Sequence, residues 1–129
     1  MARREKPDMG LGWCGRILHV DLTGGRIDVE EPPEEFYRTW LGGKALAARY
    51  LYRDMPAGAD PLGPANRVVI AAGVCAGAPL PGFSRFLVAA RSPLTGAWGQ
   101  SEAGGFFAPA LKWAGFDAVI IDGCAGRPV

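Results

Sequence analysis

Frequent glycine and proline residues limit what this chain can fold into: 19 glycines and 11 prolines occur in 129 residues. Proline fixes φ and interrupts helices and inner strands, whereas glycine tolerates positive φ and lets the backbone approach a neighbour closely. We therefore expect short elements joined by many fixed turns, with parts of the backbone lying close to a ligand or to another segment.

Alternating polar and apolar residues predict a β-hairpin near the start of the chain. The alternation runs over residues 15–22 and resumes over 26–30, and the intervening Thr23-Gly24-Gly25 supplies the turn. Later apolar runs of strand length predict four more strands, at 68–72, 85–91, 97–100 and 116–122.

Helical patterns lie between the predicted strands. A first helix begins at Pro33, with two acidic residues in its first turn, and ends before Gly42-Gly43. A second is expected over 44–52, because each glycine inside one long helix would cost about 1 kcal/mol relative to alanine. A third is expected over 106–114. This mixed order of strands and short helices favours an α+β domain built mainly on an antiparallel β-sheet.

The length and charge of the chain restrict its domain count and its partners. With 129 residues, 49% of them hydrophobic, it fits one domain of at most roughly 150 residues. We place that domain at 12–129, after a flexible extension at 1–11. A net charge of +1 gives no field that would favour nucleic acid. No apolar run reaches signal-peptide length or the ~18 residues of a membrane span, so we expect a cytoplasmic protein without a membrane partner.

The cysteine and histidine residues give no sign of a metal centre or a catalytic group. Cys14, Cys75 and Cys124 are too dispersed to supply the four thiolates of an iron–sulfur cluster from one monomer, and we expect them to be small buried residues. His19 is isolated within the predicted hairpin and is assigned to a strand surface. The sequence also lacks a nucleophile paired with a base and a phosphate loop of the Walker or Rossmann type.

Five stretches of this chain share an order and spacing with one enzyme family. They are WCGRILHVDLTGG (13–25), LGGKALA (41–47), DPLGPAN (60–66), SRF (84–86) followed by RSPLTG (91–96), and EAGGFF (102–107). From about Gly12 to Val129 the chain resembles the N-terminal domain of the aldehyde ferredoxin oxidoreductases. The fold that this resemblance implies is a base of β-sheet on which a pterin cofactor lies.

The resemblance also implies a cofactor set. Enzymes of this family bind tungsten or molybdenum through two pterins, oxidise aldehydes to carboxylic acids, and pass the electrons to a 4Fe-4S cluster and then to ferredoxin. The cluster cysteines and most active-site residues belong to later domains. By resemblance, this chain therefore needs those domains or subunits as partners and is not expected to be active alone. A non-catalytic binding or assembly module derived from the same domain is the alternative.

The resemblance implies two further properties of the chain. In the family, a sequence similar to Arg127-Pro128-Val129 continues directly into another strand, and we expect this domain to continue likewise. Because later domains cover the sheet in the family, we also expect an under-covered apolar face that favours homo-oligomers. The choice of metal, of aldehyde and of electron acceptor stays open.

By resemblance, two short segments contact the cofactor. Arg85 matches the family's pterin-contacting arginine, and a forked guanidinium suits a planar, anionic ligand. The matching backbone segment consists of Glu102, Ala103, Gly104 and Gly105, and the Glu102 carbonyl is assigned to a magnesium ion between the pterin phosphates. Many relatives have Asn where this chain has Glu102, whose carboxylate repels phosphate unless a cation intervenes. Without the resemblance, Arg85 would be a solvated edge charge and Gly104-Gly105 a plain turn.

Overall fold

The computed structural model describes residues 12–128, so the extension predicted at 1–11 lies outside the described residues. The strands are β1 (Ile17–Asp21), β2 (Arg26–Glu30), β3 (Arg67–Ala72), β4 (Phe86–Arg91), β5 (Trp98–Ala103) and β6 (Ala118–Asp122). The helices are α1 (Glu34–Trp40), α2 (Gly43–Asp54) and α3 (Phe107–Trp113). Each predicted element is present, although β5 runs on to Ala103 instead of ending at residue 100. None of the described helices is long and apolar enough to span a membrane.

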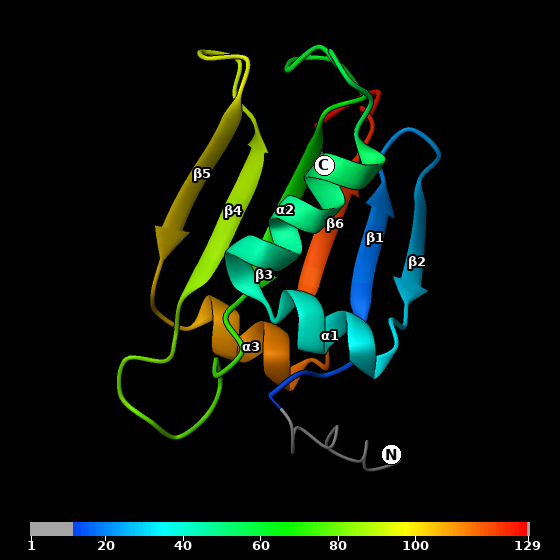
Figure 1. The fold of residues 1–129 in the computed structure, drawn as a ribbon. Coiled ribbons are helices and arrows are strands. Elements are labelled where there is room, and N and C mark those ends of the chain that lie inside the picture. The colour runs from blue at the N-terminus through cyan, green and yellow to red at the C-terminus, as the bar shows by residue number, and fades with distance from the viewer. Residues whose placement is uncertain (1–11, 129) are drawn as a thin grey trace.

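The strands form a single sheet in the order β2-β1-β6-β3-β4-β5 (Figure 1). β1 and β6 are parallel, whereas the other neighbouring pairs are antiparallel. At the turn of the β1–β2 hairpin, the Asp21 carboxylate accepts the Gly24 N–H at 2.9 Å and a hydrogen bond from Arg26 at 3.0 Å. The predicted hairpin and the predicted α+β class are therefore confirmed.

The main core lies between one face of the sheet and the helices α1 and α2, which lie on the same side of it (Figure 1). Successive strand residues point to opposite faces, so every second residue enters this core. The buried strand residues are Ile17, Val69, Ala71, Leu87, Ala89, Ala118 and Ile120. Tyr37 of α1 and Leu46, Ala47, Tyr50 and Leu51 of α2 pack in the same core. Burial of each large apolar side chain contributes roughly 1.5–3 kcal/mol.

Residues 41–43 separate α1 from α2. Leu41, with a φ of 56°, ends α1 and donates its N–H to the Tyr37 carbonyl oxygen at 2.7 Å. A Cβ atom on Gly42 would lie 3.0 Å from the Ala72 carbonyl oxygen, and Gly43 has a φ of 54°. The glycine pair thus lets the chain turn closely against the end of β3. The predicted break between two helices is confirmed.

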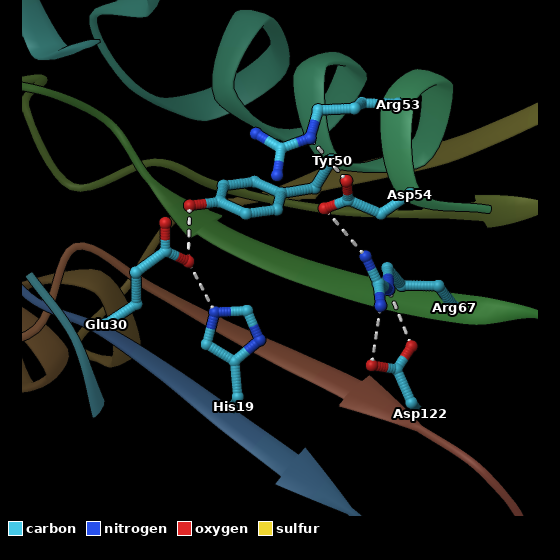
Figure 2. Close-up of polar contacts among 7 residues, drawn as sticks. All are labelled: His19, Glu30, Tyr50, Arg53, Asp54, Arg67 and Asp122. Carbon is cyan, nitrogen blue, oxygen red and sulfur yellow. Dashed lines mark hydrogen bonds and ion pairs between the residues drawn. The ribbon is translucent and has the colours of Figure 1, made fainter. Parts of the chain in front are cut away.

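A first polar network holds α2 against the hairpin (Figure 2). The Glu30 carboxylate accepts the Tyr50 hydroxyl at 2.9 Å and lies 2.7 Å from His19 Nε2. Burial, and then the hydrogen bond to Glu30, raise the pKa of Tyr50, so its hydroxyl stays protonated and donates. His19 lies on a strand, as predicted, but its side chain is half-buried beside Tyr50 and not fully at the surface. The reason is that β1 turns His19 to the face of Ile17, which α1 and α2 cover.

A second polar network fixes the C-terminal end of α2 (Figure 2). Arg67 of β3 donates from Nε and Nη2 to the two carboxylate oxygens of Asp122, at 2.6 and 2.8 Å. Its Nη1 donates to Asp54, the last residue of α2, at 3.1 Å. Forked contacts of this kind fix direction as well as distance. The two networks together therefore hold α2 in one position over the sheet.

A buried ion pair fixes the segment that enters β1. Lys112 Nζ of α3 lies 2.6 Å from Asp117 Oδ1, and both residues are almost fully buried. Asp117 also accepts the N–H groups of Cys14 and Gly15, at 2.9 and 2.8 Å, while Lys112 Nζ donates to the Gly12 carbonyl at 2.9 Å. The charges are thus compensated by each other and by backbone groups, as burial requires.

The cysteines do not occupy the buried positions expected of them. Cys75 and Cys124 are exposed, and Cys14 is half-buried. Cys75 lies in the turns that follow β3, and Cys124 follows β6, so both lie outside the regular elements that supply the core. The expectation from residue type alone is therefore wrong for these two residues.

The second face of the sheet is apolar and is covered only in part. α3 packs against it at one end, near Ala72 and Phe86. Beyond α3, one cross-strand row consists of Val29, Leu18, Val119, Ile70 and Val88. A second row consists of Ile27, Val20, Ile121 and Val68. These nine residues, which we call the open face, are all half-buried or exposed. The under-covered face implied by the resemblance is therefore present.

Candidate cofactor-binding site

The pairing of β4 with β5 brings the predicted site residues together. Phe86 lies opposite Ala103, and Leu87 lies opposite Glu102. Arg85, just before β4, and Gly104, just after β5, therefore leave the sheet side by side. A Cβ atom on Gly104 would lie 3.5 Å from Ser84 Oγ, which shows how closely the two segments approach. This end of the sheet is the lower end in Figure 1.

A small pocket of about 120 Å³ opens at this end of the sheet. Its lining combines the start of α2, the end of β3, the start of β4 and the end of β5: Gly43, Lys44, Ala71, Gly73, Arg85, Phe86, Leu87 and Glu102. We call it the Arg85 pocket. Of the predicted site residues, Arg85 and Glu102 line it, whereas Ala103, Gly104 and Gly105 continue from its rim.

The Arg85 pocket has an excess of positive charge. Its charged side chains are Arg85, Lys44 and Glu102, and Lys44 Nζ lies 3.8 Å from Glu102 Oε1. Arg85 is exposed, and among the described residues its guanidinium makes no hydrogen bond or ion pair. α2 begins at this pocket without a side-chain cap at Gly42 and without an acidic residue in its first turn. Its free N–H groups add to the positive potential there.

Lys44 is the site residue that sequence reasoning missed. It lies 41 positions before Arg85 in the chain, and only the packing of α2 on β3 and β4 brings the two residues to one pocket. Two signals were available: a basic residue directly after the Gly42-Gly43 pair, at the start of a predicted helix, and the place of Lys44 in the matched stretch LGGKALA (41–47). Neither signal gave Lys44 a role at the site.

The structure also contains a larger groove away from the predicted residues. It has a volume of about 500 Å³ and lies between the C-terminal half of α2 and the β4–β5 hairpin. Its lining is mostly apolar and includes Leu51, Tyr52, Met55 and Trp98, with Arg91 as the charged member. The smaller Arg85 pocket is the better candidate for the predicted site, because a planar anionic ligand needs the cations and close backbone that gather there.

The predicted magnesium site is not tested by the geometry. Within residues 12–128, no group of three or more His, Cys, Asp or Glu side chains could hold a metal ion. The prediction for Glu102 concerns its main-chain carbonyl, which every residue offers. It stays a prediction.

The sequence as a whole matches one protein family. The profile described as "Aldehyde ferredoxin oxidoreductase, N-terminal domain" matches residues 17–129. The chain belongs to this family. The sheet and the helices described above are therefore those of an aldehyde ferredoxin oxidoreductase N-terminal domain.

Individual relatives agree with this family assignment. The tungsten-containing aldehyde ferredoxin oxidoreductase of Pyrococcus furiosus is 43% identical over 118 residues, which are 92% of this chain. The WOR-like subunit of an aliphatic sulfonate oxidoreductase from the same organism is 32% identical over 121 residues, covering 89% of this chain. Among solved structures, a chain of the active site complex BamBC of benzoyl coenzyme A reductase, in complex with 1,5-dienoyl-CoA, superposes with a TM-score of 0.87 and 35% identity over 90% of this chain.

The N-terminal domain is a small part of these relatives. This chain spans 20% of the length of the Pyrococcus furiosus aldehyde ferredoxin oxidoreductase and 18% of the BamBC chain. The predicted family membership and fold are thus confirmed, while the activity of the whole enzymes concerns proteins about five times longer.

Proposed function

We propose that this chain is the N-terminal cofactor-binding domain, or a separate subunit with that role, of a tungsten- or molybdenum-pterin oxidoreductase. Such an enzyme oxidises aldehydes to carboxylic acids and passes the electrons through a 4Fe-4S cluster to ferredoxin in the cytoplasm. The observation that carries the proposal is the position of Arg85, whose guanidinium has no partner among the described residues, beside Gly104 at a positively charged pocket.

The residues of the Arg85 pocket fit a pterin cofactor. A pterin with a phosphate tail is flat, rich in hydrogen-bonding atoms and anionic, so it needs a forked donor and closely approaching backbone. Arg85 supplies the fork, and the segment from Ala103 to Gly105 supplies backbone without bulky side chains. The Glu102 carbonyl is the group that would face a magnesium ion. When bound, the cofactor supplies the metal centre at which electrons leave the aldehyde.

The remaining parts of the enzyme belong to partner domains or subunits in this proposal. Tungsten is the favoured metal, because the relative that is 43% identical contains tungsten. The cluster ligands are proposed to lie outside this chain, because its three cysteines are dispersed through the sequence. Iron and labile sulfide at cluster stoichiometry in a monomeric preparation of this chain would contradict that part.

Substitution of Arg85 tests the proposed role in cofactor binding. The chain is combined with the remaining domains of a tungsten-containing relative, and pterin content and aldehyde oxidation are measured for wild type, Arg85→Lys and Arg85→Ala. We expect both variants to bind pterin less well by about 1.5–3 kcal/mol, roughly ten- to a hundredfold, because a lysine ammonium cannot bridge two acceptors on a planar ligand.

The control for this experiment is Arg38→Ala, which removes an exposed arginine of α1 that pairs with Glu34. It should leave pterin content unchanged, and circular dichroism should show that all variants are folded. Full cofactor occupancy and turnover in Arg85→Ala would contradict the proposal. Full occupancy without turnover in the wild-type assembly would favour the non-catalytic module.

A further inference from the structure

The Arg85 pocket contains an ion pair that its proposed ligand would have to rearrange. Lys44 and Glu102 come from different elements, α2 and β5, and their closest charged atoms are 3.8 Å apart. Their side chains are 60% and 40% exposed. At this distance the contact is not a hydrogen bond, and an exposed pair of this kind is weak. Lys44 or Glu102 can therefore give up this contact when a stronger partner is present.

The backbone of Lys44 is held firmly although its side chain is exposed. Lys44 lies in the first turn of α2, and α2 is fixed by the Tyr50–Glu30 contact and by the Asp54–Arg67 ion pair. An ammonium group on a fixed backbone position can reach a limited space. That space includes the mouth of the Arg85 pocket, which Lys44 lines.

The balance of charge favours an anion over Glu102 as the partner of Lys44. The two cations and one carboxylate that line the pocket leave a net charge of about +1. A phosphate monoester carries about −1.5 to −2 at neutral pH and three strong acceptor oxygens, whereas a carboxylate carries −1 and two. A phosphate group entering the pocket therefore attracts Lys44 more strongly than Glu102 does and repels the Glu102 carboxylate.

We propose that Lys44 binds the phosphate end of the pterin cofactor, and that Glu102 is a positioning residue that keeps the ammonium group over the pocket until phosphate replaces it. This inference rests on the proposed function and adds a second cation beside Arg85. Arg85 takes the ring system and Lys44 takes the phosphate. The Glu102 carboxylate then competes with weakly charged ligands for the Lys44 ammonium group. A strongly charged ligand displaces it.

Two pterins that differ only by a phosphate test this division of roles. Neopterin monophosphate and neopterin are titrated into the full 129-residue chain at low ionic strength, with pterin fluorescence as the readout. We expect the wild-type chain to bind neopterin monophosphate more tightly than neopterin. Lys44→Met should lower the affinity for the monophosphate about tenfold, because one charge-assisted contact to phosphate is lost, and should leave the affinity for neopterin unchanged. Glu102→Gln should raise the affinity for the monophosphate about threefold, because the carboxylate that competes for Lys44 is removed.

The controls separate this inference from the proposed function. Arg38→Met removes one exposed cation that does not line the pocket and should change neither affinity. If both probes bind wild type but Lys44→Met changes the two affinities equally, or changes neither, the proposed role of Lys44 is wrong. The proposed cofactor site is not contradicted by that result. If neither probe binds wild type, the cofactor site itself is wrong and the role of Lys44 falls with it.

Discussion

Two of the buried side chains, Lys112 and Asp117, carry opposite charges. Taking two charges out of water costs several kcal/mol, and their attraction offsets this only when every remaining polar atom has a partner. Asp117 meets this condition through the N–H groups of Cys14 and Gly15, and Lys112 through the Gly12 carbonyl. The pair therefore makes the fold depend strongly on both members being present.

We predict that Lys112→Met lowers the free energy of unfolding by about 3–5 kcal/mol, because it leaves the Asp117 carboxylate buried without a cation. Urea denaturation followed by circular dichroism measures the change. The double variant Lys112→Met, Asp117→Asn should lose less stability than the two single variants lose in sum, with a coupling free energy of at least about 1 kcal/mol. Arg38→Met, which breaks an exposed pair on α1, is the control and should cost about 0.5 kcal/mol or less. Simple additivity would contradict the prediction.

The three cysteines are predicted to differ in reactivity. Burial, and then the nearby Asp117 carboxylate, raise the pKa of the Cys14 thiol to about 11. Near pH 8 its thiolate fraction is therefore on the order of 0.1%, and the thiolate is the reactive form. Cys75 and Cys124 are exposed. We expect iodoacetamide to label these two first and Cys14 only at higher pH, as followed by peptide mass spectrometry.

Denatured protein is the control for the labelling experiment, because all three cysteines should then react at similar rates. Rapid alkylation of Cys14 in the folded chain near pH 8 would contradict the burial and charge environment described for it.

Residues of the candidate site were predictable where the resemblance gave them a role, and unpredictable where only packing brought them to the pocket. Arg85 and Glu102 were assigned from short matched segments, and the structure places both at one pocket. Lys44 also lies in a matched stretch, LGGKALA, but the match gave it no role, because its proximity to Arg85 depends on how α2 lies across the sheet. The partial burial of His19 could not be predicted for a similar reason: an alternating pattern shows which residues share a face but does not show which face a helix covers.

At the scale of elements, close contact between turns depends on single glycines. Gly123, at the end of β6, has a φ of 83°, and a Cβ atom there would lie 2.5 Å from Thr23 Oγ1 and 2.8 Å from the Thr23 backbone nitrogen. Thr23 belongs to the β1–β2 turn, and its hydroxyl accepts the Cys124 N–H at 3.0 Å. The end of β6 and the hairpin turn are therefore joined by a contact that leaves no space for a side chain.

We predict that Gly123→Ala lowers the free energy of unfolding by about 2–3 kcal/mol, from the left-handed φ together with the overlap with Thr23. Gly126→Ala is the matched control, because a Cβ atom there meets nothing within 4 Å and its φ is not in the positive region. Chemical denaturation of the two variants measures the difference. Equal stability of both variants would show that the turn can shift to accommodate a methyl group.

The elements themselves followed from local patterns. Alternation predicted β1 and β2, and the glycine pair predicted the break between α1 and α2. The end of β5 was missed because the residues from Gln100 to Ala103 are not rich in strand-forming types. They are extended because they pair with β4, and such pairing is not visible in the composition of one segment.

On the scale of the whole molecule, the open face is the surface that most requires a partner. Ile27 and Val29, on the edge strand β2, are 68% and 43% exposed. Contiguous apolar surface on this scale favours association. We predict that the isolated chain forms dimers or larger species and binds a hydrophobic dye, as measured by light scattering and dye fluorescence.

The variant Ile27→Lys, Val29→Lys tests this prediction. Two charges on the open face should shift the chain towards monomer and reduce dye binding, because lysine on an edge strand opposes pairing and desolvation. Tyr52→Lys is the control: it replaces another exposed apolar side chain, on α2, and should leave association unchanged. A wild-type chain that is monomeric and binds no dye would contradict the prediction.

The parallel pairing of β1 with β6 has a consequence for how the chain acquires its structure during synthesis. Ile17 pairs with Ala118, so strands about one hundred residues apart in sequence lie side by side inside the sheet. Such distant contacts form late, because the intervening chain must be ordered or looped first. At a synthesis rate of about 5–20 residues per second, roughly 5–20 s pass between the synthesis of β1 and the synthesis of β6. Throughout that interval the new chain presents an unpaired strand edge, which makes the nascent hairpin the segment most exposed to aggregation and to capture by chaperones.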